Sequence, residues 1–285
     1  MCRLYGFRSS ILSGVHQSLI AAENALALQS ERHRDGWGLA HYVGLFPHLI
    51  RNDQRAGADA LYRELSAVVA TRTFVAHIRR ATVGNVNVLN CHPFQHGAWT
   101  FAHNGEISAY ADNAPLQQRV RALVDERFRR HILGSTDSEV IFHIFLSQLG
   151  RMVDDVHHLG VSLEHVKRAL ARTVDTVVEV AEDLPDRPCK LSFVLTNGNV
   201  LVGYRRLCEL SFSTHKTRCG ERDTCVAYDE MRCEREVTDG MVKHLIVASE
   251  QIGTENVWSE LDDGEFVSVD HGMNLTRGVL SDCAA

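Results

Sequence analysis

The chain has 285 residues, of which 45% are apolar and 23% charged, and it carries a net charge of −6. This composition is typical of a globular protein, and the mild negative charge with only short basic clusters argues against nucleic-acid binding. No stretch reaches the roughly 18 apolar residues of a membrane helix, and no secretory signal is recognisable, so we expect a cytoplasmic protein with no membrane partner.

In chain order, the first elements mix strands and helices. Residues 1–10 indicate a strand, and the apolar spacing over 15–30 indicates an amphipathic helix. A turn-rich segment then precedes a short strand at 39–43, a helix at 57–70 and a buried strand at 74–78.

A strand at 99–103 follows, and Asn104-Gly105 predicts a turn at its end because both residues tolerate positive φ. Helices are predicted at 115–131, 137–150 and 160–183, the second capped by Ser135 or Thr136.

The last third returns to strands. Residues 191–196 and 200–204 flank Asn197-Gly198 as a hairpin, and 244–249 and 265–269 are further strands. Because the order is strands, helices, strands, without repeated β-α-β units, the sequence predicts an α+β fold with antiparallel sheets.

Cys2 is the first candidate for chemistry. Removal of Met1 requires a small second residue, and it would leave a thiol and a free α-amine on Cys2. An α-amine has a pKa near 8, so it can act as the base that activates its own side chain. A second-position cysteine without any role explains the dipeptide equally well.

Three further segments carry polar groups at the ends of predicted elements. Arg79 follows a buried strand and offers a planar fork for a carboxylate, or a surface ion pair. Asn104 and Gly105 could donate two N–H groups to one oxyanion, or simply form a turn. Asp137 could bind an ammonium group at a helix start, or only fill the first turn of the helix.

The joint order of these motifs resembles that of the class II glutamine amidotransferases, which are N-terminal-nucleophile hydrolases. The resemblance is carried by Cys2, His77-Ile78-Arg79-Arg80-Ala81-Thr82, Asn90-Cys91-His92-Pro93, His103-Asn104-Gly105 and Thr136-Asp137-Ser138. It implies a four-layer αββα sandwich of two antiparallel sheets. It also implies a single domain over residues 2–285, with Met1 removed and with no metal or cofactor.

The resemblance assigns a role to each matching residue. It implies that Cys2 is the nucleophile and, through its amine, the base. It implies that Asn104 and Gly105 form the oxyanion hole. Arg79 would then bind the α-carboxylate of a glutamyl substrate and Asp137 its α-ammonium group.

Thr82 and His92 match positions near the glutamine pocket. Two residues depart from the glucosamine-6-phosphate synthase type, because Arg80 stands where tryptophan is common and Val83 where histidine is common. These differences predict a different pocket lid and a different leaving group.

The segments Asp35-Gly36-Trp37-Gly38 and Ala248-Ser249-Glu250, together with Trp258, look like the stand-alone subgroup. That subgroup includes YafJ-type proteins and the γ-glutamyl hydrolase of ergothioneine synthesis, and we interpret Trp37 as structural. We expect no synthase domain, and therefore net hydrolysis of a small glutamyl substrate. The alternatives are a glutaminase subunit that supplies ammonia to a partner synthase, and a non-catalytic binding module; a homodimer is also compatible.

Four cysteines lie in one polar segment: Cys208, Cys219, Cys225 and Cys233. Their spacing lacks the close pair that is typical of zinc sites. A structural metal, a disulfide or redox pair, and unrelated thiols all stay open.

Overall fold

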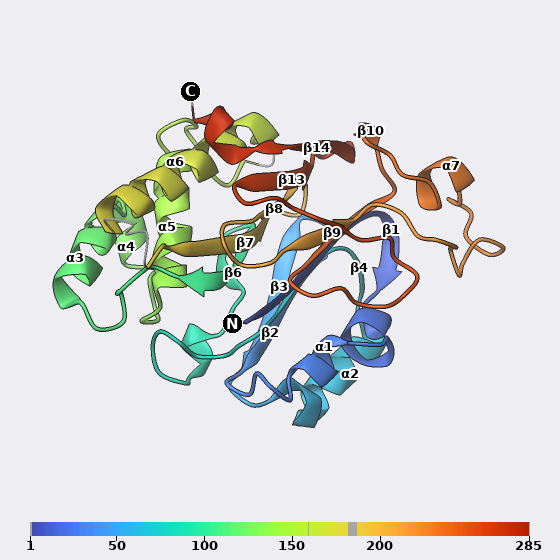
Figure 1. The fold of residues 1–285 in the computed structure, drawn as a ribbon, viewed down its shortest axis with the longest axis horizontal. Coiled ribbons are helices and arrows are strands. Elements are labelled where there is room, and N and C mark those ends of the chain that lie inside the picture. The colour runs from blue at the N-terminus through green and yellow to red at the C-terminus, as the bar shows by residue number, and fades with distance from the viewer. Residues whose placement is uncertain (1, 159, 182–186, 285) are drawn as a thin grey trace.

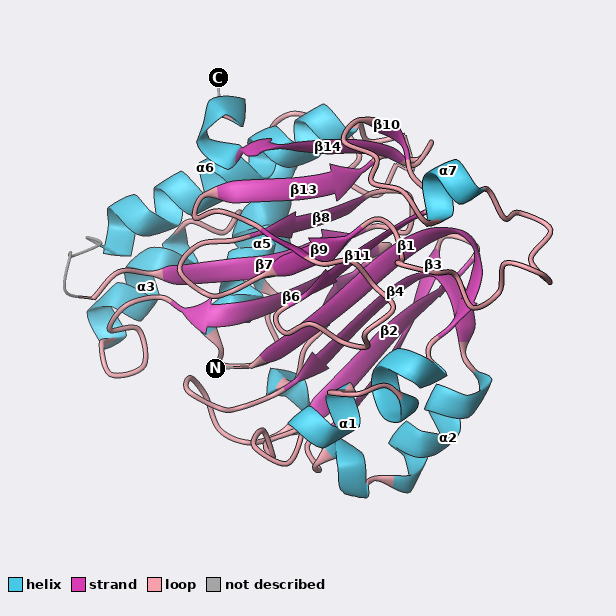
Figure 2. Cartoon of the chain, turned by 45° about the vertical axis from the view of Figure 1, so that its right-hand side comes forward, coloured by secondary structure: helices cyan, strands magenta, loops and turns pink. Residues whose placement is uncertain are grey.

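The structure is a computed structural model that describes residues 2–158, 160–181 and 187–284. Two seven-stranded antiparallel sheets lie face to face, and helices cover their outer sides (Figures 1 and 2). The predicted α+β fold and its four-layer αββα arrangement are confirmed. Among the described residues, no helix is long and apolar enough to cross a membrane.

The first sheet has β1 at its centre, paired with β4 on one side and β11 on the other. Its strands, in spatial order, are β12 (Ser259–Glu260), β9 (Ser211–Ser213), β11 (His244–Ala248), β1 (Arg3–Gly14), β4 (Ala70–Ile78), β2 (Trp37–Val43) and β3 (Phe46–Asn52).

The second sheet is built around the hairpin β7–β8, whose turn is Asn197-Gly198 as the sequence predicts. Its strands, in spatial order, are β10 (Gly240–Met241), β14 (Asn274–Val279), β13 (Glu265–Val269), β8 (Leu201–Tyr204), β7 (Lys190–Thr196), β6 (Trp99–Glu106) and β5 (Phe94–His96).

The helices form two outer layers. Those beside the first sheet are short: η1 (Gln17–Ala21), α1 (Leu26–Gln29), η2 (Ala56–Ala58) and α2 (Ala60–Val68). Those beside the second sheet are α3 (Ala114–Ala122), α4 (Glu126–Arg129), α5 (Asp137–Leu149), α6 (Leu163–Ala181) and η4 (Leu280–Cys283). The remaining helices, η3 (Val88–Asn90) and α7 (Glu230–Cys233), lie in connections.

Each interface between layers has its own apolar core. The inter-sheet core includes Leu4 of β1, Val75 of β4 and Ala102 of β6. The sheets approach closely at Gly6, where a Cβ would lie 2.9 Å from Val194 Cγ1. This close packing fixes the start of β1 against the strands of the opposite sheet.

Three predicted elements are wrong in detail. Residues 15–30 form two short helices rather than one, because Asn24 has a φ of 58° between them. The predicted helix 115–131 is also two helices, α3 and α4, with Asp125 between them. The predicted turn at Asn104-Gly105 lies inside β6, where the two residues pair with Ser192 and Leu191. For the helix predicted at 160–183, α6 ends at Ala181, and residues 182 and 183 lie outside the described residues.

Candidate active site

Cys2 lies at the entrance of β1, beside the chain that leaves β4. The register pairs Arg3 with Ile78, so Cys2 is adjacent to the loop that begins at Arg79. Arg80 N donates to Cys2 Sγ over 3.4 Å, and Sγ contacts Arg80 O at 3.3 Å. The thiol therefore contacts the backbone of Arg80 at the edge of the first sheet where β1 begins.

The segment Ala248-Ser249-Glu250 fixes this end of β1. Ser249 Oγ accepts a hydrogen bond from Leu4 N at 2.9 Å, and Glu250 forms an ion pair with Arg3. The motif therefore anchors the two residues that follow Cys2.

Arg79 is buried, with 2% of its surface exposed. Its guanidinium donates to Asn85 O and Val83 O at 3.1 Å each, and to Gly84 O at 3.3 Å. Three N–H groups of the fork thus fold the following loop around Arg79. The sequence predicted a residue that binds substrate, and the structure adds this organising role.

Asp137 is the first residue of α5, directly after the N-cap Thr136. Its buried carboxylate accepts hydrogen bonds from Ile107 N at 2.7 Å and Ser138 N at 2.8 Å. Burial raises the pKa of Asp137 to about 6, although these two bonds oppose the shift. The carboxylate thereby connects the exit of β6 to the helix start.

Arg79 and Asp137 both act on Cys2. Burial raises the pKa of the Cys2 thiol; the bond from Arg80 and the charge of Arg79 lower it, while the charge of Asp137 raises it further. Cys2 has intermediate exposure. A thiol whose pKa is raised is protonated at neutral pH, so its reaction requires a base. The structure thus places Arg79 directly beside the backbone segment that contacts Cys2 Sγ, and the charge of Asp137 reaches the same thiol.

Asn104 and Gly105 lie near the end of β6, and the start of β1 lies close to this end in Figure 2. Residues alternate between faces along a strand. Cys2 and Asn104 each lie two residues from a member of the inter-sheet core, Leu4 and Ala102. Both side chains therefore face the space between the sheets.

Gly105 has a φ of 154°, and a Cβ there would lie 1.9 Å from Lys190 O. Only glycine fits this position. Asn104 is 2% exposed, and its Oδ1 has no partner among the described residues.

Thr82 and His92 have contrasting surroundings. Thr82 is exposed in the loop folded around Arg79. His92 is buried. The centre of its ring lies 4.1 Å from the centre of the His77 ring and 4.6 Å from the centre of the Phe94 ring. Burial and neighbouring positive charge hold the pKa of His92 well below its usual value, so its imidazole is neutral. The predicted role of both residues near the glutamine pocket stays a prediction.

Asp35 is a functional candidate that the sequence argument did not single out. Its Oδ2 accepts a hydrogen bond from Ala81 N at 2.8 Å, and its N donates to Arg79 O at 3.1 Å. Asp35 thus bonds to the backbone of the residues on either side of Arg80, and Arg80 contacts Cys2. The signal was the segment Asp35-Gly36-Trp37-Gly38, whose Trp37 is buried and donates to Asp59 Oδ2, in keeping with a structural role.

His103 and Ser138 connect β6 to α5. His103 Nδ1 lies 2.8 Å from Ser138 Oγ, and its Nε2 lies 3.0 Å from Lys190 O. Burial lowers the pKa of His103 to about 4, so the ring is neutral at pH 7. These contacts fix β6 next to Asn104.

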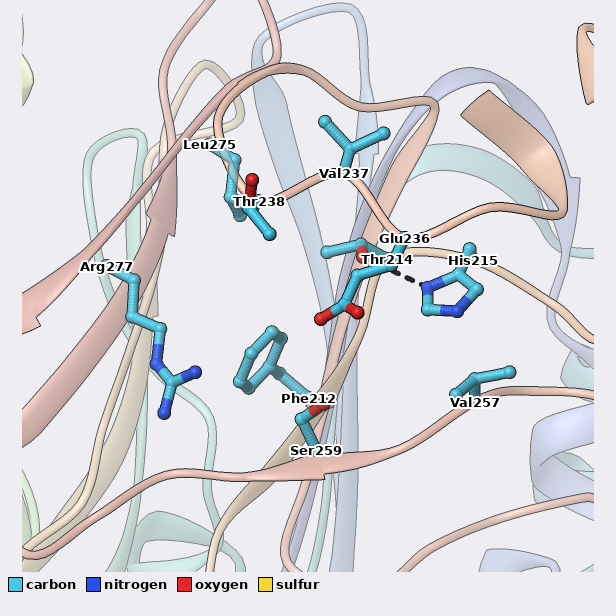
Figure 3. Close-up of a pocket in the computed structure, with 10 residues that line it drawn as sticks. All are labelled: Phe212, Thr214, His215, Glu236, Val237, Thr238, Val257, Ser259, Leu275 and Arg277. Carbon is cyan, nitrogen blue, oxygen red and sulfur yellow. Dashed lines mark hydrogen bonds between the residues drawn. The ribbon is translucent and has the colours of Figure 1, made fainter. Parts of the chain in front are cut away.

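Two cavities lie away from these residues, and neither is lined by Cys2, Asn104 or Asp137. The smaller, of about 70 Å³, lies between the outer strands of the two sheets (Figure 3). There Arg277 lies with its guanidinium carbon 5.3 Å from the centre of the Phe212 ring and forms an ion pair with Glu265. The larger, of about 550 Å³, is lined by Cys219, Cys225 and Cys233 but not by Cys208.

Comparisons with known proteins agree with this geometry. The family model described as glutamine amidotransferases class-II matches residues 1–284. The Saccharomyces cerevisiae protein DUG3, named as a probable glutamine amidotransferase, is 27% identical over 99% of this chain and 85% of its own length.

A second relative is the γ-glutamyl-hercynylcysteine sulfoxide hydrolase of Mycobacterium tuberculosis, which is 27% identical over 38% of this chain and 50% of its own length. Among solved structures, a glutamine aminotransferase class-II domain protein from Silicibacter pomeroyi has a TM-score of 0.65 at 19% identity. The alignment covers 97% of each chain. The family resemblance predicted from the sequence is confirmed.

Proposed function

Because the chain belongs to the class II glutamine amidotransferases, we propose that it hydrolyses the side-chain amide of glutamine or of a γ-glutamyl compound, with Cys2 as the nucleophile. The family and the γ-glutamyl hydrolase relative support an amidohydrolase with this class of substrate. The observation that carries the assignment of Cys2 is that its Sγ lies 3.4 Å from Arg80 N and 3.3 Å from Arg80 O, directly beside buried Arg79.

The substrate is oriented by two opposite charges. A glutamyl head group has one carboxylate and one ammonium group, which suit Arg79 and Asp137 respectively. Both side chains are buried and fixed by backbone hydrogen bonds, so little entropy is lost when they bind substrate. The clamp would direct the amide carbonyl toward Cys2.

The first chemical step forms a thioester. The α-amine of Cys2, exposed by removal of Met1, takes the thiol proton, and the sulfur adds to the amide carbon. The Asn104 side-chain amide and the Gly105 N–H stabilise the resulting oxyanion, at about 3 kcal/mol for each donor. The C–N bond then breaks, and the leaving amine takes the proton.

Water completes the reaction. It adds to the thioester carbon, again with the α-amine as base, and the C–S bond breaks to release the free γ-carboxylate and the thiol. Thr82, in the exposed loop beside Arg79, is suited to contact the substrate from the solvent side, and buried His92 to support the pocket wall. The product amine or ammonia leaves to solvent.

A pair of cysteine variants tests the assignment of the nucleophile. Cys2→Ala should lower glutamate release from glutamine and γ-glutamyl amides at least ~10³-fold, because no thioester can form. Cys283→Ala, a change of the same residue type at the far end of the chain, should leave turnover unaltered. Turnover by folded Cys2→Ala within tenfold of the wild type would reject Cys2 as the nucleophile.

A further inference from the structure

The larger cavity lies on the outer face of the first sheet, away from the inter-sheet face to which Cys2 belongs. Tyr5 and Phe7 of β1 and Ile246 of β11 form its apolar floor. Its walls come from η1 and from the segment between β9 and β10 that carries α7, which projects beside β1 in Figure 1. Its volume of about 550 Å³ is that of a site for a small organic molecule.

Two buried polar atoms of residues that line this cavity have no partner among the described residues. They are His244 Nε2 and Asn256 Oδ1. Asn256 Nδ2 donates to Ile252 O at 3.2 Å, which fixes the oxygen as the unpartnered atom of its amide. Burial, reinforced by the charge of Lys216, lowers the pKa of His244 to about 3, so its imidazole is neutral.

Buried polar atoms are unfavourable without a hydrogen-bonding partner. An occupant with an N–H or O–H group would satisfy Asn256 Oδ1. The neutral ring of His244 can donate or accept, according to its tautomer.

The charges around the cavity are arranged in two zones. Lys216 and Lys243 are half-buried, whereas Glu23, Glu221 and Glu255 are exposed. Lys216 Nζ is 2.7 Å from Glu255 Oε1. Lys243 has no ion pair within the described ranges, so its ammonium group is the cation available to an occupant.

We propose that this cavity binds a small aromatic molecule that carries one anionic group and one N–H or O–H donor. The aromatic body packs on Tyr5 and Phe7. The rings of these two residues lie edge to face, with their centres 6.2 Å apart. The anionic group pairs with Lys243, and the donor bonds Asn256 Oδ1. The site does not involve Cys2, so it holds whether or not Cys2 is the nucleophile.

A matched pair of fluorescent probes tests the predicted chemistry. 1-Anilinonaphthalene-8-sulfonate has an aromatic body, an N–H group and a sulfonate, and N-phenyl-1-naphthylamine lacks only the sulfonate. The sulfonate should bind at one saturable site with a Kd at least tenfold lower than that of the neutral amine. Equal affinities, or the absence of saturable binding, would overturn the proposal.

Cysteine protection locates the bound probe. Cys219, Cys225 and Cys233 line the cavity, whereas Cys283, with a similar intermediate exposure, does not. Saturating sulfonate should slow alkylation of the three cavity thiols by iodoacetamide at least fivefold, with Cys283 unaffected, as mapped by mass spectrometry. Unchanged rates at the three thiols would place the probe elsewhere and refute the assignment.

Two substitutions test the polar contacts. Lys243→Met and Asn256→Leu should each raise the Kd of the sulfonate probe at least tenfold. Arg172→Met, which removes an exposed charge from α6, should leave it unchanged. All three should retain glutamine turnover, which separates failure at this cavity from failure at Cys2. A Kd unaltered in folded Lys243→Met protein would contradict the proposed anion contact.

Discussion

The two faces of strand β1 differ in the kinds of polar groups that lie beside them. On the inter-sheet side, near Cys2, the buried charges of Arg79 and Asp137 are bonded to backbone groups. On the outer side, His244 Nε2 and Asn256 Oδ1 are buried without partners in the described part of the chain. Backbone bonds preorganise the two charged groups near Cys2 before any substrate arrives, although Asn104 Oδ1 there is also unpartnered within the described ranges. At the second site, an occupant with a hydrogen-bonding group could satisfy the unpartnered atoms.

The largest effect expected from this difference is at Arg79. We expect Arg79→Lys to lower kcat/KM for glutamine at least ~100-fold, because lysine cannot reproduce the fork that binds three loop carbonyls and a carboxylate. Arg72→Lys, at an exposed position of β4, the strand that precedes Arg79, should have almost no effect. Steady-state kinetics with both variants measure the difference.

A substrate without the carboxylate separates the two roles of Arg79. For 4-aminobutanamide, which is glutamine without its α-carboxylate, Arg79→Lys should cost at least tenfold less than for glutamine. An equal loss for both substrates would assign Arg79 to the loop alone and remove it from the substrate clamp.

A smaller effect is expected at Asp137, and it depends on pH. Because its pKa is raised to about 6 in the fold from an ordinary 3.8, the folded state favours the protonated carboxyl. The stability contributed by this group is therefore complete below pH 3.8 and is lost as pH rises through about 6, by on the order of 3 kcal/mol. Binding of the substrate's ammonium group should instead strengthen as pH rises through about 6, because it needs the charged carboxylate of Asp137.

Asp137→Asn should remove both the pH dependence of stability and the pH dependence of substrate binding. In the wild type, kcat/KM for glutamine should rise as pH increases through about 6, and this limb should disappear in the variant, with activity ~10- to 100-fold lower at pH 7. Denaturant unfolding at pH 4 and pH 7 gives the corresponding stability difference. A limb that persists in Asp137→Asn would assign the titration to another group.

Much of this fold was predictable, because apolar periodicity reports local structure directly. The buried strand 74–78, the helix 137–150 and the hairpin around Asn197-Gly198 are all present. The strands β3, β5, β9, β10, β12 and β14 were missed. The strands β9, β10 and β12 are defined by pairing partners distant in the chain rather than by a local pattern. The strand β3 pairs with its neighbour β2, but it is only partly buried and has no regular apolar alternation.

Asn104-Gly105 shows where local reasoning fails. The dipeptide has strong turn propensity, but pairing with β7 keeps it inside β6, and its glycine is required by close approach to Lys190 O. The candidate site was predictable as a set of residue types in order. That Arg79 folds its own loop, and that Asp35 holds the chain around Arg80, depend on contacts that no local pattern contains.

The central claim is that Cys2 reacts through an α-amine that only removal of Met1 exposes. The most direct measurement compares one protein preparation before and after an N-terminal extension is cleaved to leave Cys2 as the first residue, with glutamate release and intact mass recorded for both. We predict turnover only after cleavage, together with a transient glutamyl adduct on the processed chain. Equal turnover by the extended protein, with its extension verified by mass, would contradict the account.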